Sequence, residues 1–407
     1  MTFSSQKLFK SHETNPFCQI NLPLQSFAEK KKCCGTCFPG SFFSFWRRYI
    51  NSFVISTNPF YTSMAKRHLS LKDLASELNI SISTVSRALK NHPDISPEIT
   101  RKVQELASLW HYTPNPLAMG LLKQETRMIG VIVPDLVTHF YSSIISGIEE
   151  YAKSRGYFIL LASSYESMEK EIESVSNLLQ ARVDGMIVCL SKETDRFDHF
   201  VHLIDDEIPL VFFDRVCLSE SAPCVVIDNK DAVEQIIRHF NQEKYRRIAF
   251  ISGPAHLNIS RDRVEGYLSG LKESGLKFNP YLLRSCNMLS DEALRITDDL
   301  LKLPEPPDAI FGINDMVIFT VMKELKRRGL KIPQEIGVVG FADEFHATFS
   351  TPQLTSIMHP TREIGIKAAE LFFKKMEDPT FAETVVLQTS LVVRESSARN
   401  YKLQIKD

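Results

Sequence analysis

The sequence predicts an α/β protein with two Rossmann-like lobes, preceded by a small all-α helix-turn-helix unit. From residue 127 to about residue 400, apolar β-branched runs alternate with amphipathic helical stretches. Fully apolar strands separated by helices indicate parallel sheets covered on both faces. This stretch is too long for one such sheet, so we expect two lobes. Residues 64–113, in contrast, show only helical periodicity.

The composition is that of an ordinary soluble protein of two or three domains. The chain has 407 residues, of which 43% are hydrophobic and 24% charged. A net charge of −1 excludes a polybasic nucleic-acid binder. No apolar run approaches the roughly 20 residues of a membrane span, and the N-terminus lacks the apolar core of a signal peptide. We therefore expect a cytoplasmic protein with no membrane partner. Four cysteines are scattered singly and should be buried, reduced thiols: Cys189, Cys217, Cys224 and Cys286.

Residues 1–63 show no sustained helical or strand period. The run Cys33-Cys34-Gly35-Thr36-Cys37 lacks a second ligand pair at a suitable distance, so we expect no metal there. We expect this segment to be disordered or a mis-annotated N-terminal extension, with the functional protein beginning at Met64. The alternative is a basic arm that attracts DNA non-specifically.

Three short helices are predicted after Met64. The first has its apolar residues on one face, at Leu71, Leu74, Ala75 and Leu78. Asn79 tolerates the left-handed conformation of a tight turn, and Ser81 can cap a second helix. Ser96, Pro97 and Glu98 form a strong start for a third helix. Helix, short turn and helix is the DNA-binding helix-turn-helix pattern. The alternative is an ordinary helical bundle.

Residues 71–75, 80–89 and 96–116 resemble the headpiece of the lac-repressor (LacI/GalR) family. The most specific run is Ser83-Thr84-Val85-Ser86-Arg87. The resemblance implies that the second helix enters the major groove and that four of its residues bind DNA: Ile82, Ser83, Thr84 and Arg87. The Arg87 guanidinium could bond O6 and N7 of a guanine together.

Residues 117–123 resemble the hinge helix of this family, within a linker at 114–126. The resemblance implies that Leu121 inserts into the minor groove as a wedge. Met119 and Gly120 depart from the family's Arg and Ser, which removes a phosphate-binding charge and weakens the helix. A plain flexible linker is the alternative.

The body from residue 127 should contain strands near nine apolar runs: 128–133, 157–162, 186–190, 210–213, 225–227, 247–252, 309–313, 337–341 and 354–358. Helices between them include 142–155, 231–240, 263–274, 316–328 and 363–376. Ligands of such folds bind beyond the carboxyl ends of the strands.

The family resemblance continues through the body to about residue 398, and implies lobes similar to periplasmic sugar-binding proteins. Matched positions imply an effector cleft lined by eight residues: Phe140, Tyr141, Asp214, Arg263, Met288, Asn314, Asp315 and His359. Aromatic rings pack on the apolar faces of sugars, and an Arg fork bonds hydroxyls or a carboxylate. Met288 stands in place of an aromatic residue, and Ala342 in place of an Asp that binds hydroxyls. The alternative for each of the eight is a role in lobe packing.

The sequence thus predicts a transcriptional regulator, a repressor by resemblance, that binds an operator in double-stranded DNA as a homodimer. A small molecule, a sugar or sugar derivative, should act as effector, and no cofactor is expected. Enzyme motifs such as G-x-S-x-G, Walker A and H-E-x-x-H are absent from the sequence, so we do not expect an enzyme. The rival is a sugar-binding protein without a DNA function. The expected segments are 1–63, headpiece 64–113, linker 114–126, effector-binding and dimerisation domain 127–400, and tail 401–407.

Overall fold

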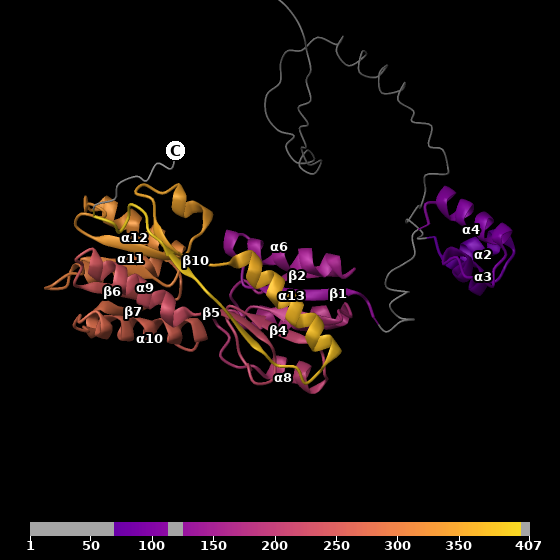
Figure 1. Cartoon of the computed structure of the whole chain (residues 1–407), viewed down its shortest axis with the longest axis horizontal. Coiled ribbons are helices and arrows are strands. Elements are labelled where there is room, and N and C mark those ends of the chain that lie inside the picture. Colours follow the sequence, from indigo (N-terminus) through magenta and orange to yellow (C-terminus); the bar gives the residue numbers. More distant parts are fainter. Residues whose placement is uncertain (1–68, 113–124, 400–407) are drawn as a thin grey trace, which may run out of the picture. The chain divides into compact units, whose positions relative to one another are not determined.

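The computed structural model describes residues 69–112 and 125–399 of the chain (Figure 1). The expectations for residues 1–63, for Leu121 and the hinge helix, and for the tail lie outside these residues. Within the described residues, no helix is both long and apolar enough to span a membrane.

The headpiece contains three helices: α2 (Leu71–Leu78), α3 (Ile82–Leu89) and α4 (Pro97–Leu109). Their ends are those that the sequence predicts. Asn79 adopts the left-handed conformation with φ 53° after α2, and the Ser81 side chain accepts a hydrogen bond from the Thr84 amide. Ser96 caps α4 in the same way. Leu74, Val85, Ala88 and Val103 are fully buried and fix the angles between the helices.

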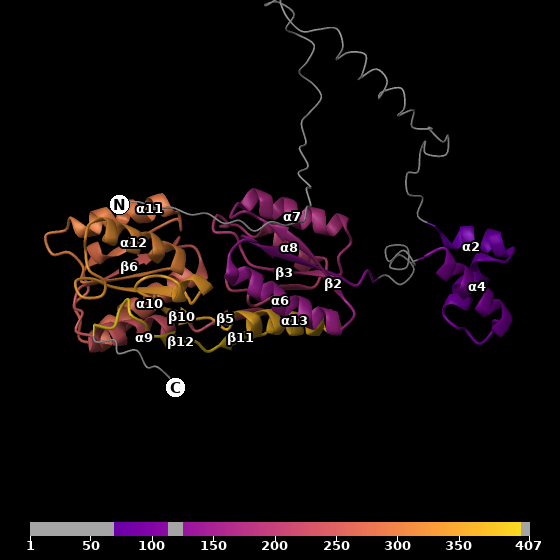
Figure 2. The ribbon, with the colours of Figure 1, turned by 90° about the horizontal axis from the view of Figure 1, so that it is seen from above.

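The first lobe is built on a parallel sheet of six described strands in the order β2-β1-β3-β4-β5-β11. The strands are β1 (Met128–Val133), β2 (Phe158–Ser163), β3 (Gly185–Val188), β4 (Leu210–Phe213), β5 (Cys224–Ile227) and β11 (Thr384–Leu387). The helices are α6 (His139–Ser154), α7 (Met168–Gln180), α8 (Asp198–Asp205) and α13 (Thr361–Glu377). Figure 2 shows α6 and α13 on one face of the sheet and α7 and α8 on the other.

The second lobe repeats this arrangement with strand order β7-β6-β8-β9-β10-β12. Its strands are β6 (Ile248–Ser252), β7 (Leu283–Ser285), β8 (Ala309–Gly312), β9 (Gly337–Ala342), β10 (Thr355–Met358) and β12 (Ser390–Val392), which runs antiparallel to β10. Its helices are α9 (Asn229–Gln242), α10 (Asn258–Glu273), α11 (Ser290–Leu301) and α12 (Asp315–Arg327), with short 3-10 turns η2 (Pro280–Leu282) and η3 (Phe345–Thr348).

The chain passes between the lobes after β5, after β10 and after β11, as Figure 1 shows. The predicted two-lobed α/β fold is therefore confirmed. All nine expected strands are present within one or two residues of their predicted ends. Strands β7, β11 and β12, which lie at sheet edges, were not predicted from the sequence. Edge strands are short and half-exposed, so they lack the continuous apolar run of a central strand. The four scattered cysteines are buried and free, as expected.

Helices α6 and α13 pack unusually closely because each presents a glycine to the backbone of the other. A methyl group on Gly147 of α6 would overlap the carbonyl oxygen of Arg362, and one on Gly365 of α13 would overlap that of Ile144. The Ser143 and Thr361 hydroxyls are hydrogen-bonded across the pair at 2.7 Å. The two helices therefore form one rigid layer.

We expect the replacement Gly147→Ala to lower the free energy of unfolding by about 1–3 kcal/mol, because the added methyl must push two backbones apart. The sign of this change distinguishes close packing from helix propensity, since propensity alone would make the Ala variant more stable by about 1 kcal/mol. Urea denaturation measures the change. Ser146→Ala, at the exposed neighbouring position of α6, is the control and should change stability little. A Gly147→Ala protein as stable as wild type would contradict the close packing.

Candidate functional site

A cavity of about 340 Å³ lies between the two lobes of the body, at the carboxyl ends of both sheets. Seven of the eight predicted effector residues line it: Phe140, Tyr141, Asp214, Arg263, Met288, Asn314 and His359. They follow β1, β4, β6, β8 and β10 or, for Met288, lie just before α11. Strands in both lobes have the order 2-1-3-4-5, and the switch point of that order is where such folds bind ligands.

Arg263 is the main cationic group of the cavity and is 3% exposed. Its Nε donates to Asn229 Oδ1 at 2.7 Å and its Nη1 donates to the Ile313 carbonyl at 2.5 Å. Its guanidinium carbon lies 3.6 Å from the centre of the Phe341 ring. Burial lowers the pKa of Arg263 to about 10, so the group is charged at neutral pH. Nη2 has no protein partner within residues 125–399, which leaves it available to a ligand.

The first lobe offers acceptors and a hydroxyl to the same space. Asp214 adopts a left-handed backbone conformation with φ 58°, which turns its side chain out of the end of β4. Its carboxylate has a single polar side-chain contact in the described part of the chain, with the Cys189 thiol at 3.9 Å. Burial raises the pKa of Asp214, although Arg215 and Arg263 oppose this shift. Burial also raises the pKa of Tyr141, so its hydroxyl stays neutral.

His359 lies where the chain leaves β10 for α13, between two aromatic rings. The ring centres of Phe140 and Phe341 are 5.3 and 5.2 Å from the imidazole. Burial, together with Arg263, lowers the pKa of His359 to about 3, so the ring is neutral at physiological pH. Both ring nitrogens are buried without a partner among the described residues. A neutral imidazole has one hydrogen-bond donor and one acceptor, and neither is hydrogen-bonded within the described residues.

Asp315 is the one predicted effector residue that the structure places outside the cavity lining. It is fully buried at the start of α12, where its carboxylate accepts hydrogen bonds from the Ser356 hydroxyl and the Glu344 amide, each at 2.7 Å. A glycine is required at position 340, because Asp315 Oδ1 occupies the space that a Cβ atom would need there. Asp315 therefore ties α12 to β9 and β10. Adjacency to Asn314 in the sequence did not reveal that the two side chains point to different sides.

The expected departure at Ala342 is visible in the structure. Ala342 lines the cavity with φ 133°, a conformation that L residues rarely adopt, and contributes no acceptor. Two residues on, Glu344 also lines the cavity, and burial raises its pKa. A carboxyl group is thus still present at this strand end, although in another position. Only its proximity to Ala342 along the chain could have pointed to Glu344.

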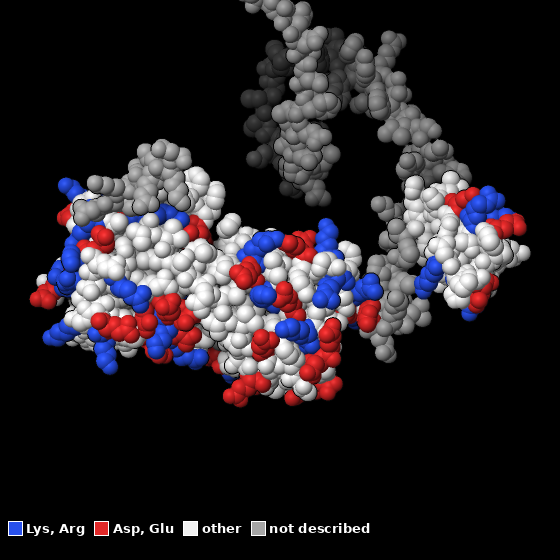
Figure 3. Space-filling view, viewed as in Figure 1, with Lys and Arg blue, Asp and Glu red and all other residues white. Residues whose placement is uncertain are grey.

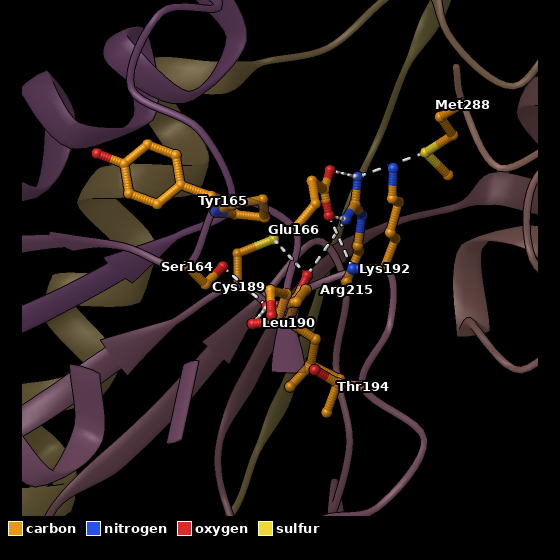
Figure 4. Close-up of polar contacts among 12 residues, drawn as sticks. Ser164, Tyr165, Glu166, Cys189, Leu190, Lys192, Thr194, Arg215 and Met288 are labelled. Atoms are coloured by element: carbon orange, nitrogen blue, oxygen red, sulfur yellow. Dashed lines mark hydrogen bonds and ion pairs between the residues drawn. The ribbon is translucent and has the colours of Figure 1, made fainter. Parts of the chain in front are cut away.

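A partly buried ion pair at the cavity was not predicted from the sequence (Figure 4). Arg215 donates to both carboxylate oxygens of Glu166, at 2.7 and 3.1 Å, and to the Met288 sulfur of the other lobe at 3.6 Å. Lys192, whose amide also donates to Glu166, reaches the Asn287 carbonyl with its ammonium at 3.1 Å. These contacts link the lobes beside the cavity. Arg215 directly follows the predicted effector residue Asp214, but its partner Glu166 lies 49 positions earlier in the chain.

The DNA-binding candidates that the structure describes lie on α3. Ile82 is 48% exposed, and Ser83 and Arg87 are exposed as well. Thr84 is half-buried, and its hydroxyl is hydrogen-bonded to that of Ser81 at 2.8 Å. Val85 and Ala88 face the core, so the exposed set forms one face of the helix.

Charges over the visible face of the lobes are mixed rather than segregated, as Figure 3 shows. No group of three or more potential metal ligands occurs in residues 69–112 or 125–399.

Comparisons with known proteins agree for both parts of the chain. Residues 70–115 match the family described as bacterial regulatory proteins, lacI family. Residues 126–395 match the periplasmic binding proteins and sugar binding domain of LacI family.

Among curated relatives, catabolite control protein A of Priestia megaterium is 31% identical over 78% of this chain and 96% of its own length. The HTH-type transcriptional repressor CytR of Escherichia coli K12 is 29% identical over 80% of this chain and 96% of its own length. A solved complex of the transcriptional regulator CelR with cellobiose is 25% identical, with a TM-score of 0.61, and covers 81% of this chain and 100% of CelR. The lac repressor dimer bound to operator shares the fold, with 22% identity, a TM-score of 0.71 and coverage of 81% and 99%.

The buried carboxyl of Asp315 should make stability depend on pH. Burial raises its pKa to about 7, well above the roughly 3.9 of an unfolded Asp. Between these values the folded protein holds a proton that the unfolded chain has lost, so stability falls as pH rises from 4 to 7. Relative to Asp315→Asn, the wild type should lose up to about 1.4 kcal/mol per pH unit across this window.

Urea denaturation of both proteins at several pH values measures this difference. Asp206→Asn, an exposed position after α8, controls for the change of side-chain chemistry. Parallel stability curves for wild type and Asp315→Asn would show that this carboxyl does not titrate in the window.

Proposed function

Because the chain belongs to the LacI family of bacterial regulatory proteins, we propose that it represses transcription under the control of a small, neutral, polyhydroxylated molecule. The observation that carries this proposal is the cavity between the lobes, which keeps a mixed set of donors and acceptors that have few partners among the described residues. The DNA-binding function is that of the family, and the headpiece supplies it. The effector class and the roles of individual residues are the proposed part.

The exposed face of α3 is suited to reading a major groove. Its first turn offers Ile82 and Ser83, an apolar group for a thymine methyl and a small hydroxyl for base edges. Arg87, one turn on, is exposed and free to bond a guanine. The cap at Ser81 orders the start of the helix before DNA is bound, so little entropy is lost there on binding.

A sugar-like effector fits the polar atoms of the cavity. Asp214 and Glu344 offer acceptors, while Arg263 Nη2 and the Asn314 amide nitrogen offer donors. Hydroxyl groups both donate and accept, so a polyol satisfies such a mixed set. A strongly anionic ligand would be repelled by the two carboxyl groups, and a strongly cationic ligand would be repelled by the guanidinium. Phe140 adds an aromatic face for an apolar sugar face. CelR binds cellobiose and another relative is a ribose operon repressor, and we propose the same ligand class here.

The effector would act by changing which arrangement of the lobes is populated. A ligand shifts such an equilibrium only by its different affinity for the two states. The contacts from Arg215 to Met288 and from Lys192 to Asn287 cross between the lobes beside the cavity, so they respond to any change in lobe spacing. The close pair α6 and α13 begins at the cavity, with Phe140 and His359, and carries such a change along the first lobe.

A second copy of the chain is the expected partner. Lobe 2 carries exposed apolar side chains around the start of α12 and η3, with Met316 46%, Phe345 59% and Phe349 69% exposed. The Phe345 and Phe349 rings lie 4.6 Å apart, and His346 between them contacts Phe319 of α12. Contiguous exposed apolar surface marks an interaction site. We propose that it contributes to a homodimer that matches the two half-sites of an operator.

The rival function, a sugar-binding protein without a DNA role, has no support among the relatives, of which CytR, ExuR and PurR are named as HTH-type transcriptional repressors. The same names place the chain at family level among regulators and not enzymes. A regulator must meet the chromosome, so we propose that the protein acts in the cytoplasm.

We expect Arg87→Ala to weaken binding to the cognate operator by roughly 1–3 kcal/mol and to relax preference at one base position. Fluorescence anisotropy with operator and with mutated operators measures both effects. Arg101→Ala is the matched control, because Arg101 lies on α4, where it pairs with Glu105. Equal losses in the two variants would mean that Arg87 contributes only charge.

We expect Arg263→Ala to abolish the effector response while DNA binding stays near normal, since the two sites share no contacts. A thermal-shift screen of sugars with wild type supplies the effector, because ligand binding raises the melting temperature. The control is Arg238→Ala, at an exposed position of α9. An Arg263→Ala protein that responds to the same sugar at an unchanged midpoint would refute the assignment.

A further inference from the structure

A second pocket, of about 490 Å³, lies behind the effector cavity in the second lobe. It is bounded by α10 on one side and by the edge strand β7 on the other. Four of its lining residues have apolar side chains, namely Ala255, Val264, Leu268 and Leu283. None of these residues lines the effector cavity.

Helix α10 separates the two spaces and faces both. Ile259 and Arg263 line the effector cavity, while their neighbours Ser260 and Val264 line the second pocket. Residues one position apart on a helix point in directions about 100° apart, so a single helix serves as a shared wall. Beyond this helix, the wall depends on side chains that meet at Gly253.

At Gly253 the wall between the two spaces is thin. A methyl group on this residue would lie 2.7 Å from Met288 Cε, 2.8 Å from Ser260 Oγ and 3.2 Å from Ile313 Cγ1. Met288 and Ile313 line the effector cavity, and Gly253 and Ser260 line the second pocket. The end of the Met288 side chain, which lines the cavity, therefore lies against Gly253 of the second pocket.

Met288 is suited to move out of this position. Its side chain is unbranched and flexible, and methionine repacks more readily than an aromatic or β-branched residue. Its polar contact is a long hydrogen bond, from Arg215 Nη2 to the sulfur at 3.6 Å. Rotation about its three side-chain bonds would move the methyl group without any change in the backbone.

A buried hydroxyl group, that of Ser260, lies beside Gly253 and Met288. Ser260 is 1% exposed, and its hydroxyl has no partner in the part of the chain that the structure describes. Buried hydroxyls are ordinarily hydrogen-bonded. The Ser260 hydroxyl lines the second pocket, beside a polar cavity. It can therefore bond the atom that joins the polar part of a ligand to its apolar part, such as a glycosidic oxygen.

We propose that Met288 is a movable partition and that the effector is a sugar carrying an apolar substituent, with the sugar in the cavity and the substituent in the second pocket. This inference rests on the proposed effector class and adds the second half of the ligand to it. The substituent would displace the Met288 methyl from Gly253 and pass Ser260. Val264, Leu268 and Leu283 would then bury it.

Matched probes test the proposal in the full-length protein: the methyl and phenyl β-glycosides of glucose, galactose and xylose, measured by isothermal titration calorimetry. The sugar part is identical within each pair, so their affinity ratio reports the substituent alone. For the sugar that binds, we expect the phenyl glycoside to bind at least tenfold more tightly than the methyl glycoside.

Two variants assign the gain to the second pocket. Val264→Trp fills the pocket from α10 without touching the cavity, so the phenyl preference should fall to about onefold while methyl-glycoside affinity is unchanged. Met288→Ala removes the partition, so the phenyl preference should rise above that of wild type. Leu330→Trp is the control, because it places the same side chain in a different groove of the same lobe and should change neither affinity.

The outcomes separate this inference from the function on which it rests. If methyl glycosides or free sugars bind but phenyl brings no gain, or if Val264→Trp keeps the gain, the second pocket is not part of the site and the sugar effector stands. If no sugar or glycoside binds wild type, both the effector class and the extended site are overturned.

Discussion

The three passages of the chain between the lobes are the constraint on which the rest of the body depends. Strand β11 completes the first sheet after the chain has already built the second lobe, and β12 then returns to complete the second sheet. Helix α13, which follows β10 of the second lobe, covers the first. Neither lobe is complete without chain from the other, so the carboxyl ends of both sheets are held beside one cavity. Large relative motion is thereby restricted to changes that the crossing segments permit.

Buried charge in the cavity is organised by that constraint. Arg263 reaches Asn229 at the start of α9 and the Ile313 carbonyl after β8, so its guanidinium is fixed before any ligand arrives. Arg215 is paired with Glu166 in the first lobe and touches Met288 in the second. Asp315, which lies outside the cavity lining, accepts hydrogen bonds from Ser356 and Glu344. Charged groups removed from water must be paired or hydrogen-bonded, and these three meet the requirement within the protein.

Other polar groups of the cavity do not meet it. His359 has two unpartnered ring nitrogens, and the buried hydroxyl of Thr138 also lacks a partner among the described residues. Such groups lower stability when nothing bonds them. Their concentration in a cavity between two lobes is typical of a site that a polar ligand completes. A ligand that bonds them gains affinity in proportion to the penalty they carry in its absence, which favours binding of polyols over apolar molecules in this part of the space.

The sequence by itself determined the headpiece helices with their caps at Ser81 and Ser96, the nine apolar strands, and the family through short motifs such as Ser83–Arg87. These features depend on local periodicity, on capping chemistry and on residues adjacent along the chain. Seven of the eight predicted effector residues also line the cavity, because most of them follow strand ends that the pattern locates, and their role in binding stays a prediction. Tertiary structure alone decided which way each side chain points. In the folded chain the Asp315 side chain points into the wall, while Asn314 faces the cavity. Folding also places Glu166 beside Arg215. Folding likewise places Met288 against Gly253, which lies 35 positions earlier in the sequence. The physical reason is that contacts between distant segments depend on how the two sheets and their helices pack, and neither periodicity nor spacing along the chain carries that information.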